Sequence, residues 1–156
     1  MAVIRTALVS AILMPATAFQ DIYAAGAGAV ATFTGHVRGD DGVAAIYLEH
    51  HPVLAAQQLQ ELAEDASMRW SLSHIVLHHR IGRVDTGEAI VCIATAAPHR
   101  ADALHACAYV IDQCKTGIAL WKQEILSSGA TRWVDPRNTD HDRVAAWAPG
   151  GISAKP

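Results

Sequence analysis

Positive charge is scarce in this chain. Its 156 residues include three Lys, and Lys and Arg together number 12 against 15 Asp and Glu, which gives a net charge of −3. Proteins that bind nucleic acid through its phosphate groups carry a basic surface, and this composition offers none. We therefore expect no nucleic-acid partner.

Cysteine is nearly absent as well. The three Cys, at positions 92, 107 and 114, form neither a C-x-x-C pair nor a zinc-ligand spacing. Small secreted domains that depend on disulfides are much richer in cysteine, and they carry it in even numbers. The composition therefore excludes a disulfide scaffold and indicates a reducing, cytoplasmic compartment.

Long hydrophobic runs are missing too. No segment approaches the roughly 20 consecutive apolar residues of a transmembrane helix, so no membrane partner is expected. Residues 1–20 are apolar but are interrupted by Ser10 and Pro15. They contain an Ala-Thr-Ala sequence that resembles a signal-peptidase site, whereas residues 3–9 suit a first β-strand equally well.

The apolar residues that are present are numerous but small. Hydrophobic residues make up 51% of the chain, and 30 of them are Ala. A high apolar fraction combined with a low net charge excludes intrinsic disorder. The length corresponds to one domain, which we place at residues 1–148, followed by a flexible tail at residues 149–156.

The spacing of the apolar residues predicts strands in pairs separated by helices. Strands are expected at residues 3–9, 27–37, 43–50, 73–81, 88–96, 120–126 and 131–134. Helices are expected at 52–70 and 98–116. We predict hairpins joining 27–37 to 43–50 and 120–126 to 131–134, with a turn at 82–87. This order indicates an α+β fold with mainly antiparallel pairing.

The second predicted helix carries basic side chains at both ends. His99 and Arg100 stand in its first turn, where a cation opposes the helix dipole unless an anion binds there. The alternative is that Arg100 reaches a surface carboxylate and His99 packs. At the other end, Lys115 lies about 40° from Ile111 on the predicted apolar face. Its side chain is therefore either half-buried, or extended so that its ammonium reaches solvent.

Three further cations stand near predicted strand ends or loops. Lys122 follows Lys115 closely, in the next strand, and Arg38 and Arg137 follow strands in loops, where side chains bind ligands or face solvent. The nine His include no H-x-H and no H-E-x-x-H, so no metal site is expected. Nucleotide-binding and nucleophile motifs are absent, and we expect no resident cofactor.

Six short segments stand out between residues 27 and 137. They are TFTGHVR (32–38), LEH (48–50), HRIG (79–82), PHR (98–100), KT with LWK (115–116 and 120–122), and RWV (132–134). In this order and spacing they resemble the family of large, catalytic subunits of molybdopterin synthase. No single segment is diagnostic, but the combination is specific.

The resemblance implies both a fold and an activity. The fold is an α/β-hammerhead domain with an additional antiparallel β subdomain, in a homodimer capped at each end by a small ubiquitin-like carrier subunit, which makes a heterotetramer. The activity is a sulfurtransferase step of molybdenum cofactor biosynthesis. Sulfur passes from the thiocarboxylate at the carrier's C-terminal Gly-Gly to a cyclic pyranopterin monophosphate, and two transfers produce the dithiolene of molybdopterin.

The resemblance also assigns roles to residues of this sequence. Lys115 and Lys122 match the catalytic lysines, which can serve as acid, base or nucleophile. The implied substrate-binding residues are His36, Val37, Arg38, His99, Arg100, Gln123, Glu124 and Arg137. Of these, Arg137 matches an arginine that reaches the active site of the other subunit. His36 departs from the family, where Lys is common, as do Gln123 and Ala119, where a basic residue and Pro occur.

Two other hypotheses stand beside the enzyme. A non-catalytic scaffold of the same fold would bind an anion or pterin, but it would have no use for a pair of lysines. A secreted or metal-binding protein would account for the N-terminal segment and the histidines.

Overall fold

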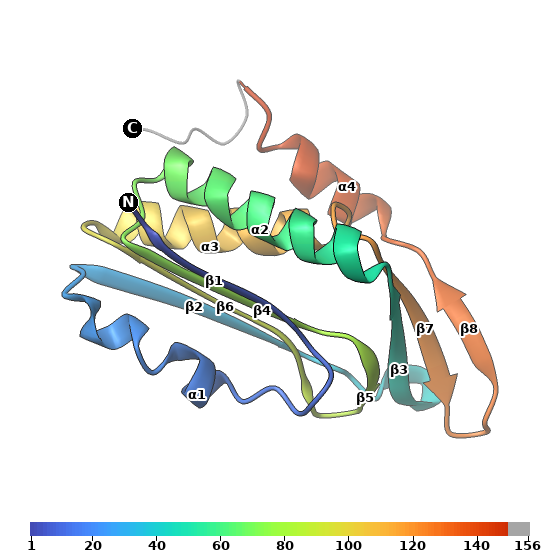
Figure 1. Cartoon of the computed structure of the whole chain (residues 1–156). Helices are drawn as coiled ribbons and strands as arrows, with labels where there is room; N and C mark the ends of the chain where they lie inside the picture. The colour runs from blue at the N-terminus through green and yellow to red at the C-terminus, as the bar shows by residue number, and fades with distance from the viewer. Residues whose placement is uncertain (150–156) are drawn as a thin grey trace.

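The computed structural model describes residues 1–149, with the backbone alone for residues 24 and 25. Its elements are β1 (Val3–Val9), α1 (Pro15–Phe19), η1 (Ile22–Ala25), β2 (Ala29–His36), η2 (Asp40–Gly42), β3 (Val43–His50), α2 (Pro52–Arg69), β4 (His74–Arg80), β5 (Gly82–Asp85), β6 (Ala89–Ala97), α3 (Arg100–Cys114), β7 (Leu120–Leu126), β8 (Thr131–Val134) and α4 (Asn138–Ala145). The α+β prediction is confirmed (Figure 1). The predicted tail lies outside the described residues, apart from Pro149.

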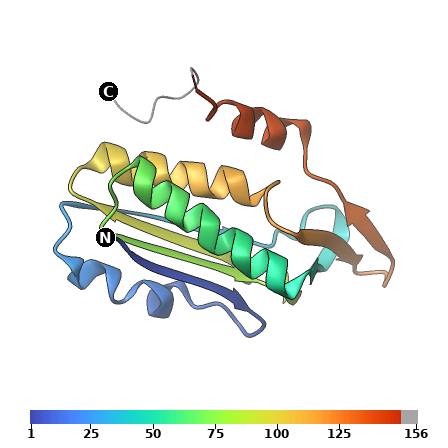
Figure 2. The same ribbon diagram turned by 45° about the horizontal axis from the view of Figure 1, so that its top comes forward.

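The first sheet is covered on both faces. Its strand order is β1-β4-β6-β2, with β1 and β4 parallel and the other neighbours antiparallel. Helices α2 and α3 lie side by side on one face, and α1 lies on the other (Figures 1 and 2). Alternation along β4 matches this arrangement, because Ile75 and Leu77 join the cluster under α2 and α3 whereas Val76 joins the cluster at α1.

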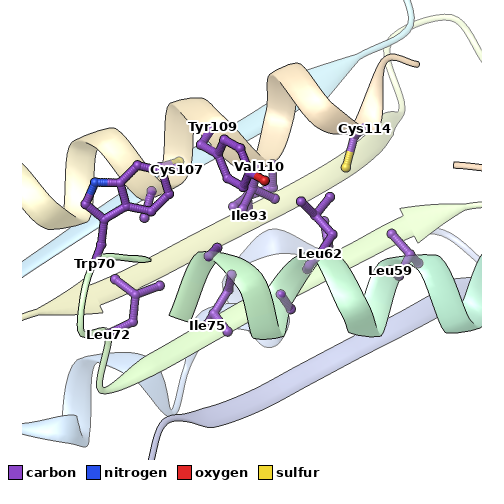
Figure 3. Packing of buried hydrophobic residues seen from close by; sticks show 14 of the residues in the cluster. Leu59, Leu62, Trp70, Leu72, Ile75, Ile93, Cys107, Tyr109, Val110 and Cys114 are labelled. Atoms are coloured by element: carbon purple, nitrogen blue, oxygen red, sulfur yellow. The ribbon is translucent and has the colours of Figure 1, made fainter. Parts of the chain in front are cut away.

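Small residues let the two long helices approach the sheet closely. Ala63 and Ala66 of α2 and Ala103 and Ala106 of α3 are almost completely buried. Larger side chains such as Trp70 fill the space between the two helices (Figure 3). The high Ala content therefore serves packing of helix on sheet, where short side chains permit a short interlayer distance.

The second sheet is smaller and projects beyond the first. Its order is β5-β3-β7-β8, and all pairs whose register is defined are antiparallel. One face carries Ile46, Leu48 and Val84, which pack with Val37 and Val43 in a separate apolar cluster. Figure 1 shows this sheet at the end of the molecule where α3 ends and α4 begins. The predicted hairpin of β7 and β8 is confirmed.

The predicted hairpin of residues 27–37 and 43–50 is wrong. β2 pairs with β6 in the first sheet, whereas β3 pairs with β5 and β7 in the second. The chain crosses between the sheets at η2, where Asp41 adopts a φ of 54°. Proximity in sequence favours local pairing, but β6 is buried along almost its whole length and needs a neighbour on each edge.

Strand β5 and helix α4 were not predicted. Residues 82–87, expected to be a turn, include the short strand β5, which pairs with β3. Helix α4 follows β8 and contains no buried residue, so it lacks the apolar periodicity by which a helix is recognised. Its one local signal is Asp140, whose carboxylate accepts a hydrogen bond from the Arg137 N–H at 2.9 Å.

Helix α3 is rotated relative to the prediction. The sequence predicts a buried face of Leu104, Cys107, Ala108, Ile111 and Cys114. Cys107 and Cys114 are buried, but the buried face also holds Ala103, Ala106, Tyr109 and Val110 and is turned by about a quarter turn at 100° per residue. Leu104 is 59% exposed. Four alanines in this helix make its apolar pattern ambiguous, and the close approach to β2 and β6 selects the alanine side.

Gly28, just before β2, lies against the backbone of Pro98, which joins β6 to α3. A Cβ atom at Gly28 would lie 2.2 Å from the backbone oxygen of Pro98. The start of β2 therefore touches the start of α3 without intervening side chains.

Within the described residues, no helix has the length and apolar character to cross a bilayer.

Candidate active site

The two predicted catalytic lysines lie at the junction of the two sheets. Lys115 is the C-cap residue of α3, and Lys122 lies in β7 after a short connection. Lys115 is exposed, which agrees with the alternative in which its ammonium reaches solvent, since the rotation of α3 moves it off the buried face. The two charges are close enough to act on one another, because Lys115 lowers the pKa of Lys122.

Lys122 lies on the same face of the second sheet as the buried Leu48, and its own side chain is exposed. It pairs with Leu48 of β3 on one side and with Val134 of β8 on the other. Side chains opposite one another in an antiparallel pair share a face, so the Lys122 stem shares the face of the buried Leu48. The pKa of Lys122 is lowered, first by partial burial of its ammonium and then by the charge of Lys115.

Charges of both signs surround Lys122. Glu124 and Asp140 raise its pKa, whereas Arg137 lowers it. Glu124 is largely buried and its carboxylate is 2.6 Å from Nε of Arg132. Because that carboxylate is shared with an arginine, it neutralises the lysine pair only in part. The site keeps a surplus of positive charge, which suits an anionic ligand.

His79 adds a neutral side chain beside this cluster. It is 8% exposed, and its Nδ1 is 2.8 Å from the backbone oxygen of Arg80. The pKa of His79 is lowered to about 4, first by burial and to a smaller extent by the charge of Lys115, against the opposing effect of that hydrogen bond. His79 is therefore uncharged at neutral pH.

The segment from His36 to Arg38 leaves the first sheet close to the second. Val37 is buried beside Leu48 in one cluster, and its N–H donates to the backbone oxygen of Glu88 at 3.0 Å. His36 and Arg38, on either side, are exposed. Arg38 forms an ion pair with Asp40 at 3.4 Å, which is weak at this exposure and leaves the guanidinium accessible.

His99 and Arg100 lie at the opposite end of α3 from Lys115. The helix spans 15 residues, so its ends are separated by about 22 Å. Both side chains are exposed, and His99 is the N-cap residue. One chain therefore does not bring these two residues to the lysine pair.

Gln123 also faces away from the lysines. It pairs with Tyr47 and Trp133 on the outer face of the second sheet, opposite to Lys122. We call this outer face, with Tyr47, Trp121 and Trp133, the aromatic face. These three rings are 40%, 53% and 60% exposed, and exposed clusters of large apolar side chains commonly mark contacts with other proteins.

Three residues of the site were missed by sequence reasoning. They are His79, Arg132 and Asp140. His79 and Arg132 belong to the HRIG and RWV segments, so a signal existed. Arg132 meets Glu124 within the β7–β8 hairpin, whereas His79 is affected by Lys115, which is distant in sequence. No cluster of three or more metal-ligating side chains occurs among residues 1–149.

Comparison with known proteins gives a consistent relationship. The sequence profile described as MoaE protein matches residues 9–117. The chain is 39% identical over 124 residues to the molybdopterin synthase catalytic subunit of Vibrio cholerae, which covers 78% of this chain and 82% of that relative. It is also similar to the molybdopterin biosynthesis MoaE protein from Burkholderia ambifaria, with a TM-score of 0.72, 38% identity and coverage of 94% and 98%.

A more distant structure shares the fold. It is a complex of subunits 1 and 2 of the molybdopterin-converting factor from Helicobacter pylori, with a TM-score of 0.67, 20% identity and coverage of 88% of this chain and 92% of that one. The matched profile includes α2, α3 and Lys115 and ends before β7. The resemblance inferred from the six segments is confirmed: the chain belongs to the MoaE protein family of molybdopterin synthase catalytic subunits.

Proposed function

We propose that this chain transfers sulfur from the C-terminal thiocarboxylate of a small carrier subunit to a cyclic pyranopterin monophosphate, forming the dithiolene of molybdopterin. The observation that carries the proposal is the pairing of Lys115 with Lys122, whose pKa is lowered by partial burial and by Lys115. A lysine with a lowered pKa has more neutral amine near physiological pH and can exchange protons in catalysis.

The charge of the site suits both reactants. A thiocarboxylate and a phosphate monoester are anions, and Lys115, Lys122 and Arg137 outnumber the nearby carboxylates of Glu124 and Asp140. Arg38, exposed at the end of β2, adds a further cation at this end of the molecule. In this mechanism, one lysine holds the anionic sulfur donor while the other moves protons during attack on the pterin.

The small carrier is the proposed partner. The related structure from Helicobacter pylori is a complex of two subunits, and a carrier tail that ends in Gly-Gly is slender enough to enter a site at a sheet junction.

We further place the protein in the cytoplasm. All three cysteines, Cys92, Cys107 and Cys114, are buried and free, as expected in a reducing compartment.

Reconstitution tests the activity directly. Thiocarboxylated carrier and pterin precursor are mixed with the wild-type chain, and the dithiolene product is measured. Lys115→Ala should lower turnover on the order of 10²-fold or more, because it removes a group that acts in the transition state. Lys155→Ala is the matched control, since it removes a lysine remote in sequence from the pair. A wild-type chain that binds the precursor without converting it would support the scaffold hypothesis instead.

A homodimer completes the proposed site. His99 and Arg100 lie about 22 Å from Lys115 along α3, which is too far for both ends to hold one small substrate. A second copy would bring its own His99 and Arg100, or its Arg137, to the first copy's lysines. The aromatic face is a candidate contact because it also carries Glu49 and Arg83, and opposite charges on one patch are self-complementary across a twofold axis. Because this face is opposite to Lys122, the partner's residues would have to reach the lysines around the edge of the sheet.

Mixing two inactive variants tests the shared site. Lys115→Ala and Arg100→Ala protomers are unfolded together, refolded and assayed. Mixed dimers would contain one site with both residues intact, so part of the wild-type turnover should return. No recovery, with mixed dimers demonstrated by mass, would mean that Arg100 acts away from the partner's lysines. Trp133→Ala tests the contact surface, and an unchanged dimer mass would exclude the aromatic face.

A further inference from the structure

We propose that Trp147 is a positioning residue that anchors α4 against α3 and thereby holds Arg137 and Asp140 beside Lys122. The inference rests on the proposed function only in the claim that the placement of Arg137 and Asp140 serves catalysis. The anchor itself is a statement about contacts within one chain.

The anchor is an aromatic cluster closed by a hydrogen bond. The indole of Trp147 is 6% exposed and meets the rings of Trp70 and Tyr109 edge-on, with centroid distances of 5.7 and 5.5 Å. Its Nε1–H donates to Oδ2 of Asp112 at 2.8 Å. A buried indole whose only polar group is satisfied has a defined orientation, which makes it suited to fix the chain on both sides of it.

A second group ties α4 to the same carboxylate. Nη2 of Arg143, in the last turn of α4, is 3.0 Å from Oδ2 of Asp112. Asp112 is thus shared by Trp147 and Arg143, and its side chain is 15% exposed. One carboxylate of α3 therefore holds α4 and the residue just beyond it.

Residues of α2 also contact this aromatic cluster. The Tyr109 hydroxyl donates to Asp65, and the Arg69 guanidinium lies 4.7 Å from the Tyr109 ring centroid while pairing with Asp65 at 2.9 Å. Figure 3 shows Trp70 and Tyr109 between α2 and α3. The surface on which Trp147 docks is therefore part of the main core and does not depend on α4.

Helix α4 has little else to hold it. It spans eight residues and buries none of them, and isolated helices of this length are unstable in water. Its first turn is the part that matters for the site, because Arg137 and Asp140 both act on Lys122. Figure 2 shows α4 lying along α3 and connected to the second sheet by the segment after β8. Without the anchor at residue 147, the first turn would lose its support.

A titration of the lysines tests the anchor without any substrate. The chain contains three Lys, so selective labelling of the lysine side chains gives three resonances, and Lys122→Arg assigns one of them. Arg137 lowers the pKa of Lys122 more than Asp140 raises it. Trp147→Ala should therefore raise the pKa of Lys122. Met68→Ala, which removes an exposed side chain of α2, should leave it unchanged.

The conservative variant separates anchoring from general stability. Trp147→Phe keeps an aromatic ring but loses the donor to Asp112, so it should restore most of the wild-type titration. If Trp147→Ala does not fold, the smaller change expected in Trp147→Phe and in Arg143→Ala supplies the test. A folded Trp147→Ala whose Lys122 titrates as in the wild type would overturn the proposal.

A double-mutant cycle tests the consequence for turnover. If Trp147 acts through Arg137, then Trp147→Ala should raise KM in the wild-type background and add little to Arg137→Ala. Additive losses would show that Trp147 acts by another route and would overturn this part of the proposal. An inactive wild-type chain whose Lys122 titration still responds to Trp147→Ala would contradict the proposed function and leave the anchor supported.

Discussion

His79 donates a hydrogen bond from Nδ1 to the backbone oxygen of Arg80 over 2.8 Å. A carbonyl oxygen only accepts, so the proton of the neutral ring stands on Nδ1 and the lone pair on Nε2. This places a neutral acceptor in the surroundings of Lys115, whose charge acts on the ring. Because protonation of the His79 ring is disfavoured in the folded chain, the stability of the fold depends on pH.

We predict an acid-sensitive stability that depends on His79. Burial lowers its pKa from 6.5 to about 4, so between these values the unfolded chain binds a proton that the folded chain does not. The contribution is complete above pH 6.5 and is lost as the pH falls toward 4, by about 3 kcal/mol in total. Denaturant unfolding at several pH values should show this slope in the wild type and a weaker one in His79→Gln.

The control for this prediction is the exposed His105 in α3. His105→Gln should retain the wild-type slope between pH 6.5 and 4, because an exposed ring has similar surroundings in both states. Parallel curves for the wild type and His79→Gln would contradict the prediction.

A second prediction concerns the electrostatic balance at Lys122. Glu124 raises its pKa, so Glu124→Gln should lower that pKa further, since the neutral amide no longer stabilises the ammonium. If the neutral amine of Lys122 is the reactive form, the acidic limb of the pH–rate profile should move to lower pH. Both shifts are measurable, by lysine titration and by turnover across pH.

Glu64→Gln provides a matched control for Glu124, because Glu64 is an exposed carboxylate of α2 outside the site. It should change neither the titration of Lys122 nor the profile. An unchanged or raised pKa of Lys122 in Glu124→Gln would contradict the prediction.

The third prediction concerns the contact between β2 and α3. In Gly28→Ala, the added methyl group would lie 2.2 Å from the backbone oxygen of Pro98, so the start of α3 must move. Overpacking of this kind typically costs about 1–3 kcal/mol. Thermal and denaturant unfolding should show the loss, and precursor binding should weaken if His99 and Arg100 hold the substrate. Wild-type stability would mean that the two backbones separate at little cost.

The amphipathic helix α2 and most of the strands could be predicted from the sequence. Their signals are local: apolar residues at helical spacing, β-branched runs, and Pro52 at the first position of α2. The pairing of β2 with β6 could not be predicted, because it joins strands about sixty residues apart. Helix α4 was missed for a related reason, since it is held by contacts of Trp147 and Arg143 with Asp112 of α3 rather than by a buried apolar face of its own.

The candidate site, like the fold, could be predicted from the sequence only in part. Six segments in order were enough to assign the family, and with it the lysine pair and the cationic turn at His99 and Arg100. Which of these residues meet depends on the tertiary structure. The register of β7 places Lys122 and Gln123 on opposite faces of the second sheet, and the length of α3 separates Arg100 from Lys115. Residue identity and local spacing are properties of the chain, whereas proximity depends on which distant surfaces pack together to bury apolar area.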